Sequence, residues 1–167
     1  MSLNINITLN HEIINLLHKE ATDLLKSLIA IPSFSKEENK TADVLVHFLQ
    51  ARKIKTERLV NNIWATNLHF DPKKPSLLLN SHHDTVKPNK GYTVDPFHPF
   101  EAEGKLFGLG SNDAGGCLVS LLATFLYFYD KENLPYNIIF VASAEEEISG
   151  HDGIELILPQ LPKIEFG

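Results

Sequence analysis

Two short apolar segments, residues 76–80 and 137–142, constrain the fold of this chain more than any other feature. Both are short, and their composition is that of strands covered on both faces. Between them lies a long apolar stretch, residues 114–129, which we interpret as a largely buried helix. Helices that alternate with buried strands along a chain predict a layered α/β structure.

Two amphipathic helices are expected near the amino terminus. In the first, apolar residues recur at helical spacing from Ile13 to Leu28, Asn10 stands at the cap position, and the pattern ends before Pro32. In the second, Ser35 followed by Glu38 predicts a capping box at the start of the helix. One face of this second helix carries the apolar residues Ala42, Leu45, Val46 and Leu49.

The remaining elements complete the expected fold. We expect a strand over residues 63–68, a polar loop over residues 87–110, and a short helix over residues 153–158 that ends at Pro159. Together these elements predict a three-layer α/β/α fold with a mostly parallel mixed sheet. A chain of 167 residues fits one domain.

Composition excludes several classes of function. A net charge of -6 argues against nucleic acid as a partner, since proteins that bind it usually carry a basic patch. Cys117 is the only cysteine, so no internal disulfide can form. Residues 1–6 lack a signal-peptide pattern, and the most apolar stretch, residues 118–129, is too short to span a membrane. We therefore expect a cytoplasmic protein.

The first polar cluster, residues 81–86, directly follows the strand over residues 76–80. Side chains alternate along an extended chain, so His82 and Asp84 project to the same side. A metal-binding histidine commonly donates its other ring N–H to a carboxylate. The pair is a candidate metal site, although a histidine and an aspartate at a strand end also occur as solvated loop residues.

The second cluster, residues 108–116, opens the predicted long helix. Asp113 stands at the helix entrance, where an N-cap is the usual role of an aspartate. The glycines around it also resemble a phosphate-binding loop. That alternative is weak, because neither the Gly-Lys-Ser/Thr pattern nor the G-x-G-x-x-G spacing is present.

The third cluster follows the strand over residues 137–142 and holds three adjacent carboxylates, Glu145, Glu146 and Glu147. Such carboxylates repel one another unless cations or water screen them. A solvated charged face would explain the run, but its place at the end of a buried strand favours a site. The three clusters together supply an imidazole and several carboxylates, a donor set suited to zinc, cobalt or manganese.

In these clusters the chain resembles the M20 metallopeptidase family, the group of acetylornithine deacetylase, succinyl-diaminopimelate desuccinylase, aminoacylase-1 and the glutamate carboxypeptidases. The resemblance covers nearly the whole chain. Three family motifs occur in order: S/G-H-x-D-x-V, G-R-G-x-x-D-x-K-G, and D-E-E with a Gly-containing turn after it. They are matched by Ser81, His82, Asp84 and Val86; by Gly108, Gly110, Asp113 and Gly116; and by Glu145, Glu146 and Glu147 with residues 148–153.

The resemblance implies a site for two zinc ions, for which cobalt can substitute. It makes His82 a ligand of one ion, Asp113 the carboxylate that bridges both, and Glu147 a ligand of the second. Asp84 would orient the histidine, and Glu146 would be the general base that takes a proton from water. A second alignment would make Glu145 the base, but the ungapped turn after the glutamates favours Glu146.

The resemblance also implies a substrate class. The chain looks closest to acetylornithine deacetylase-like proteins, which implies hydrolysis of small N-acetyl or N-succinyl amino acids and a place in amino-acid biosynthesis, arginine biosynthesis in particular. Leu109 and Gly115 replace the Arg and Lys of the second motif, which affects packing or substrate preference rather than the ligands. A di- or tripeptidase, a carboxypeptidase of the same superfamily, and a non-catalytic α/β module are the alternatives.

Family members continue past the point that matches residue 167. The resemblance therefore implies that residues 1–167 are the N-terminal portion of a zinc-exopeptidase-like catalytic domain, incomplete at its carboxyl-terminal end. It assigns further metal ligands and a dimerising lid domain to the remainder. We expect a homodimer in the full-length form and no activity from residues 1–167 alone, because each ion would then have too few ligands.

Overall fold

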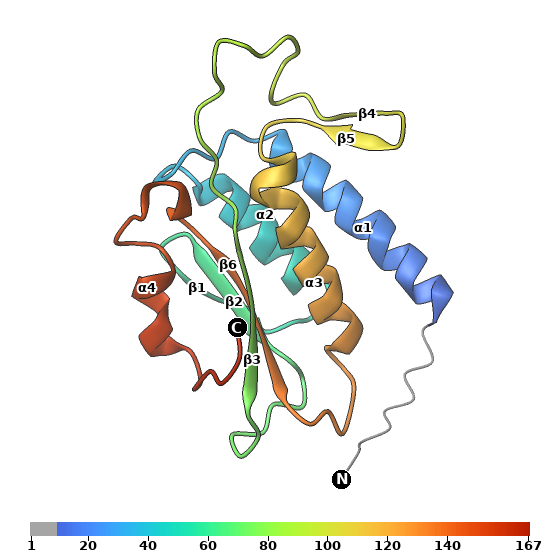
Figure 1. The fold of residues 1–167 in the computed structure, drawn as a ribbon. Helices are drawn as coiled ribbons and strands as arrows, with labels where there is room; N and C mark the ends of the chain where they lie inside the picture. The colour runs from blue at the N-terminus through green and yellow to red at the C-terminus, as the bar shows by residue number, and fades with distance from the viewer. Residues whose placement is uncertain (1–9) are drawn as a thin grey trace.

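The computed structural model describes residues 10–167, which form a mixed sheet with helices on both of its faces (Figure 1). Residues 1–6, whose sequence lacks a signal-peptide pattern, lie outside the described residues. Four strands form the main sheet in the order β1-β2-β6-β3, and β4 and β5 form a separate hairpin. The strands are β1 Glu57–Leu59, β2 Asn62–Thr66, β3 Ser76–His82, β4 Phe100–Ala102, β5 Lys105–Phe107 and β6 Asn137–Ser143.

The expected helices are present, with some shifts in their bounds. The side chain of Asn10 accepts hydrogen bonds from the backbone N–H groups of Glu12 and Ile13, so the predicted cap of the first helix is confirmed. Within residues 10–167 no helix is both long and apolar enough to cross a bilayer. The helices are α1 His11–Ile29, α2 Asn39–Gln50, α3 Gly116–Phe128 and α4 Ile154–Ile157, with single turns η1 Ser111–Gly115, η2 Glu146–Ile148 and η3 Leu158–Gln160.

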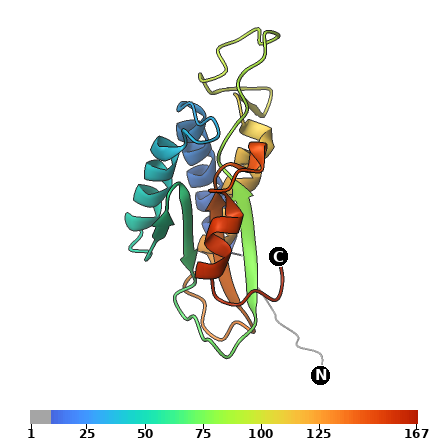
Figure 2. The same ribbon diagram turned by 90° about the vertical axis from the view of Figure 1, so that its left-hand side faces the viewer.

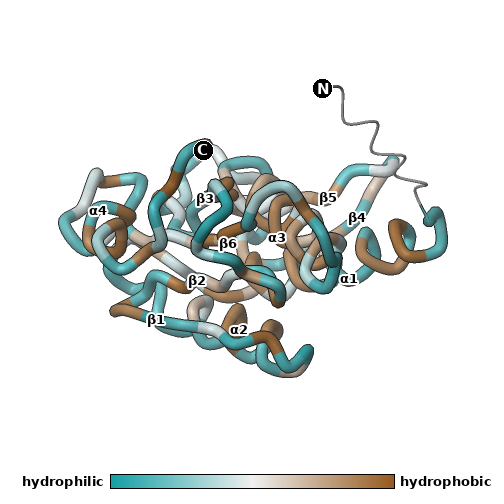
Figure 3. The backbone as a smooth tube through the Cα atoms, turned by 90° about the horizontal axis from the view of Figure 1, so that it is seen from below, coloured by the Kyte–Doolittle hydropathy of each residue, from teal (hydrophilic) through white to brown (hydrophobic). Residues whose placement is uncertain are grey.

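The sheet separates two layers of helices, as the expected three-layer fold requires. Helices α1, α2 and α3 cover one face, and α4 lies against the other (Figure 3). Side chains of β6 alternate between the two layers, so Phe140 packs with the three helices while Ile139 and Val141 pack with α4. Burial on both faces explains why the segment over 137–142 is apolar without interruption.

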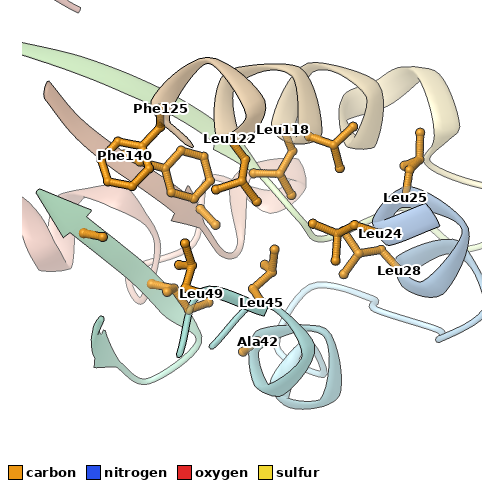
Figure 4. Close-up of a cluster of buried hydrophobic side chains, with 14 of the residues drawn as sticks. Leu24, Leu25, Leu28, Ala42, Leu45, Leu49, Leu118, Leu122, Phe125 and Phe140 are labelled. Carbon is orange, nitrogen blue, oxygen red and sulfur yellow. The ribbon is translucent and has the colours of Figure 1, made fainter. Parts of the chain in front are cut away.

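The larger core lies between the sheet and the three helices (Figure 4). Its centre is aromatic: Phe125 of α3 packs on Phe140 of β6, with ring centroids 5.8 Å apart. Leucines of α1 and α2 close this core from the other side. The labelled residues of Figure 4 are Leu24, Leu25, Leu28, Ala42, Leu45, Leu49, Leu118, Leu122, Phe125 and Phe140.

Strand pairing confirms a mixed sheet, but parallel pairs do not predominate in the described part. β3 pairs with β6 in parallel, whereas β1 with β2 and β2 with β6 are antiparallel. Only residues 60–61 separate β1 from β2, and so short a connection permits only an antiparallel hairpin. The connection from β3 to β6 contains α3 and is long enough for the crossover that a parallel pair needs.

The capping box predicted for the second helix is wrong. Glu38 occupies the cap position of α2, but no side chain caps the helix. The hydroxyl of Ser35 instead donates to the carboxylate of Asp84 at 2.7 Å, and Glu38 accepts hydrogen bonds from groups outside the helix. Contacts that are distant in sequence have replaced the local pattern at this helix start.

The long connection between β3 and α3 is also more ordered than expected. The loop predicted over residues 87–110 contains the hairpin of β4 and β5, in which Phe100 stacks on Phe107 with centroids 4.9 Å apart. This segment rises beyond the end of the sheet at which β3 and β6 terminate (Figures 1 and 2). The predicted site residues lie at that same end.

Candidate metal site

The carboxyl ends of β3 and β6 bring two of the three clusters together. The strands are parallel neighbours, and His82, the last residue of β3, lies opposite Ser143, the last residue of β6. Glu146 and Glu147 begin the turn η2 shortly after β6 ends. Parallel strands end at the same edge of a sheet, so residues far apart in sequence meet there.

Asp113 reaches the same place from the turn η1, just before α3. Its Oδ1 lies 3.2 Å from Nε2 of His82, and its side chain is 76% exposed. Asp113 does not cap the helix: α3 begins after Gly115 without a side-chain cap. The ordinary structural role of an aspartate at this position is therefore excluded.

Gly115 explains one departure from the family's second motif. A Cβ atom there would lie 2.6 Å from the carbonyl oxygen of Gly110 and 2.6 Å from Cδ1 of Leu25. Only glycine lets η1 pack this closely against α1. The lysine that the motif has at this position does not fit the packing of this chain.

The ring of His82 is oriented by Asp84. Its Nδ1 lies 3.0 Å from the backbone oxygen of Asp84 and 3.2 Å from Oδ1 of the same residue. Both partners are acceptors, so Nδ1 carries a proton and Nε2 faces Asp113 and Glu146. Burial works against the charged ring, but hydrogen bonding and charge from Asp84, with Glu146 nearby, raise the pKa of His82 to about 9. The surroundings of this ring thus favour positive charge.

Three atoms that could bind a metal ion converge next to this ring, where positive charge is favoured. One atom each from His82, Asp113 and Glu147 lies within 4.8 Å of the other two. Burial raises the pKa of Glu147, and the neighbouring Asp113 adds to the effect. An imidazole nitrogen and two carboxylate oxygens that repel one another are a donor set that fits a divalent cation such as zinc.

Asp84 contacts His82 of this donor set and is completely buried. Its carboxylate accepts hydrogen bonds from the hydroxyl of Ser35 at 2.7 Å and from the backbone N–H groups of Glu146 and Glu147, both at 3.1 Å. Burial opposes ionisation, but the hydrogen bonds of His82 and of these donors lower the pKa of Asp84 to about 2. Asp84 is therefore a carboxylate that links the histidine to the glutamates.

The three glutamates have different surroundings. Glu145 is buried in a left-handed backbone conformation (φ 53°), and its side chain occupies the space that a Cβ at Gly150 would need. The side chain of Glu146 is 59% exposed, and its Oε2 lies 3.5 Å from Nε2 of His82. Glu147 is half-buried and belongs to the donor set. The base and ligand roles expected for Glu146 and Glu147 remain predictions.

Several residues that support the site are not recognisable as such from the sequence. The sequence pattern predicts a helix cap for Ser35 and Glu38 and indicates no role for His83, Asn61 and Asn62. All three of these unassigned side chains are buried. Asn62 holds the loop after β6, since its Oδ1 accepts from the backbone N–H of Ala144 at 3.0 Å. Only the polarity of the Asn61-Asn62 pair at the start of β2 could have signalled this.

Replacing Asp84 tests the link between the histidine and the glutamates. Asp84→Asn is expected to lower metal affinity by about 10–100-fold, because the amide places an N–H donor where only acceptors fit. The measurement is a chelator-competition titration of the full-length gene product with zinc. Asp130→Asn, at an aspartate whose side chain is 71% exposed, is the control and should bind zinc normally. Equal affinity in both variants would contradict this role for Asp84.

The chain is similar to known proteins over the segment that contains the candidate site residues. A family model described as peptidase family M20/M25/M40 matches residues 78–166, which is more than half of the chain. This match includes residues 78–82 of β3, the turn η1 and both candidate glutamates.

Among curated proteins, the chain is similar to the succinyl-diaminopimelate desuccinylase of Buchnera aphidicola subsp. Acyrthosiphon pisum (strain Tuc7). The two are 30% identical over 156 residues, which cover 87% of this chain and 40% of the relative. The desuccinylase of Delftia acidovorans is 26% identical over 149 residues, covering 83% of this chain and 39% of that one. The chain thus spans about two fifths of the length of these curated relatives.

Solved structures share the fold. Human carnosine dipeptidase 1 superimposes with a TM-score of 0.66 at 22% identity, covering 87% of this chain and 36% of that chain. A dinuclear metal-binding peptidase of the M20 family from Bacillus subtilis gives a TM-score of 0.62 at 16% identity, covering 87% and 40%. At these identities the likeness concerns the arrangement of helices and strands.

Proposed function

Because the chain belongs to peptidase family M20/M25/M40, we propose that it carries the metal-binding part of a hydrolase that cleaves the amide bond of N-acyl amino acids. The observation that carries this proposal is the convergence of donors from His82, Asp113 and Glu147 within 4.8 Å of one another. An exposed carboxylate outside the donor set, that of Glu146, lies beside them. Such a hydrolase needs these two components: a cation site and a free base.

We assign the cation site to zinc, with cobalt as a substitute. His82 would hold one of two ions, Glu147 the other, and Asp113 both, with further ligands supplied from outside the residues described. When bound, such ions supply Lewis-acid chemistry, because they lower the pKa of water and polarise a carbonyl group. The nitrogen and oxygen donors present here match that choice of metal.

Glu146 would act as the general base and then as the general acid. Its exposed carboxylate is free to accept a proton from water, and it can pass that proton to the nitrogen of the leaving amine. The oxygen of that water bonds to the acyl carbon and the C–N bond breaks, so the products are a carboxylic acid and a free amino acid. Asp84 and the backbone of η2 hold Glu146 in reach of Nε2 of His82, so the proton is handled next to the donor set.

The acyl group is proposed from the curated relatives. The named activity of those relatives is desuccinylation of succinyl-diaminopimelate, and the coarser class shared with deacetylases is hydrolysis of an N-acyl amino acid. We propose a small N-succinyl or N-acetyl amino acid as substrate and a role in amino-acid biosynthesis. We further propose that residues 1–167 form the first part of the catalytic domain and that the full-length protein is a homodimer.

A substrate panel tests the proposal. The full-length gene product, loaded with zinc, is assayed on N-succinyl-diaminopimelate, N-acetylornithine and unblocked dipeptides, with release of free amino groups as the readout. Turnover of an acylated amino acid supports the proposal, and a preference for dipeptides would identify a peptidase instead. Residues 1–167 alone are expected to be inactive. No zinc-dependent turnover of any substrate by the full-length protein would contradict the proposed hydrolase.

A further inference from the structure

We propose that Glu38 is a positioning residue that holds the glutamate turn, defined as Glu145 to Glu147, in its working conformation. The proposal rests on the proposed function, because the importance of this turn follows from the roles given to Glu146 and Glu147. Glu38 itself is separated from Glu145 by 107 positions in sequence, and within residues 10–167 no hydrogen bond joins it to His82, Asp113 or Glu147.

Glu38 is a completely buried carboxylate. Burying such a group is costly unless hydrogen bonds compensate for the lost water. Its Oε1 accepts from the backbone N–H of Lys36 at 2.9 Å and from that of Glu145 at 3.1 Å. Its Oε2 accepts from Nδ2 of Asn61 at 2.9 Å. The chain thus surrounds this carboxylate with donors, one of which belongs to the turn.

Two buried carboxylates hold the whole turn between them. Glu38 binds the backbone N–H of Glu145, and Asp84 binds those of Glu146 and Glu147 at 3.1 Å each. Three consecutive N–H groups are therefore fixed by acceptors from other parts of the chain. Glu145 has a left-handed conformation (φ 53°), which is unfavourable for a residue with a side chain and needs such support.

Glu38 is also connected to the histidine side of the site. Its partner Asn61 accepts, through its backbone oxygen, a hydrogen bond from Nε2 of His83 at 2.8 Å. His83 follows His82 in sequence and is buried. The same carboxylate thus supports both strand ends that supply the site. A role limited to starting α2 does not account for these contacts, since the side chain makes no cap.

Exchanging the carboxylate of Glu38 for an amide keeps the size of the side chain but puts a hydrogen-bond donor where the surrounding groups need an acceptor. In Glu38→Gln, the new NH₂ group must face either Asn61 or the pair of backbone N–H groups, and all of these are donors. We expect zinc affinity to fall by about 10–100-fold and kcat per folded molecule to fall by a similar factor, with KM little changed. The control is Glu37→Gln, at the exposed neighbouring glutamate.

A second change should restore a complementary hydrogen bond between residues 38 and 61. Adding Asn61→Asp to Glu38→Gln gives the new amide a carboxylate to donate to, while Arg58, which now donates to Oδ1 of Asn61 at 3.1 Å, keeps its acceptor. Most of the lost zinc affinity and kcat should return. Recovery in the double variant ties the effect to this hydrogen bond rather than to burial or volume.

The experiment uses the full-length gene product and measures three properties: zinc affinity by chelator competition, kcat and KM on the substrate that the panel selects, and stability by denaturant unfolding. Should Glu38→Gln fail to fold, Glu38→Asp, which keeps the charge but is shorter, takes its place.

Reduced zinc affinity in the folded variant, with recovery in the double variant, supports the proposal. Lower stability with zinc affinity and kcat equal to those of Glu37→Gln would overturn it. If the wild-type protein binds zinc but hydrolyses none of the substrates, the proposed function fails, and zinc affinity still tests Glu38.

Discussion

Glu146→Gln is expected to lower kcat for hydrolysis of the acylated amino acid by about 10²–10⁴-fold while leaving zinc affinity unchanged. The amide cannot accept the proton that the carboxylate takes from water, and Glu146 lies outside the group of donor atoms formed by His82, Asp113 and Glu147. The measurement combines steady-state kinetics with chelator competition on the same preparation. Loss of turnover with retained metal separates a base from a ligand.

Two further variants sharpen this result. Glu132→Gln, at an exposed glutamate in the loop before β6, should behave like the wild type. Glu147→Gln should lose zinc as well as turnover, because its carboxylate belongs to the donor set. If Glu145→Gln proves the most damaging of the three glutamate changes, the base is Glu145 and the match of the three glutamates to the family motif is shifted by one residue.

Phe125→Ala is expected to lower the free energy of unfolding by about 3–5 kcal/mol. The ring is completely buried and packs on Phe140 and Tyr129, with centroids 5.8 Å and 5.7 Å away. Its removal leaves a cavity between α3 and the sheet that neighbouring rigid elements cannot fill. Denaturant unfolding followed by circular dichroism measures the change.

Phe166→Ala is the matched control for the core variant. Phe166 is 56% exposed, and its described hydrogen bonds are made by its backbone to Ser76 and Leu78. Its truncation should change the free energy of unfolding by about 0.5 kcal/mol or less. A loss at Phe125 as small as the loss at Phe166 would show that the aromatic cluster does not hold α3 on the sheet.

Much of the fold could be predicted because local patterns and long-range packing agree there. Asn10 is followed by an amphipathic helix and caps it in the structure. The apolar run before His82 is the strand β3, and alternation along the extended chain does place His82 and Asp84 in contact. The three-layer order followed from the same alternation of helices and buried strands.

The rest could not be predicted, because distant partners decided it. Ser35 and Glu38 have the spacing of a capping box, yet both side chains serve residues more than twenty positions away: Asp84 for Ser35, and Asn61 and Glu145 for Glu38. Their sequence neighbourhood contains no sign of those partners. β1, β4 and β5 have three residues each, which is too short for a periodic pattern to stand out. The antiparallel pairing of β2 with β6 likewise depends on the position of β2 in the sheet, which its own sequence does not specify.

The parallel pairing of β3 with β6 has a consequence for how an ion would bind at the proposed metal site. The donor atoms of His82, Asp113 and Glu147 are adjacent only when these strands are side by side with α3 packed across them. In the unfolded chain the same groups are separated by long segments, so an ion meets them one at a time. An ion that recognises the three together binds the native state alone, and its binding free energy adds to the stability of that state. With the proposed metal site, the supply of the ion and the stability of the folded protein would be linked: a shortage of the ion would lower the free energy of unfolding as well as remove the proposed activity.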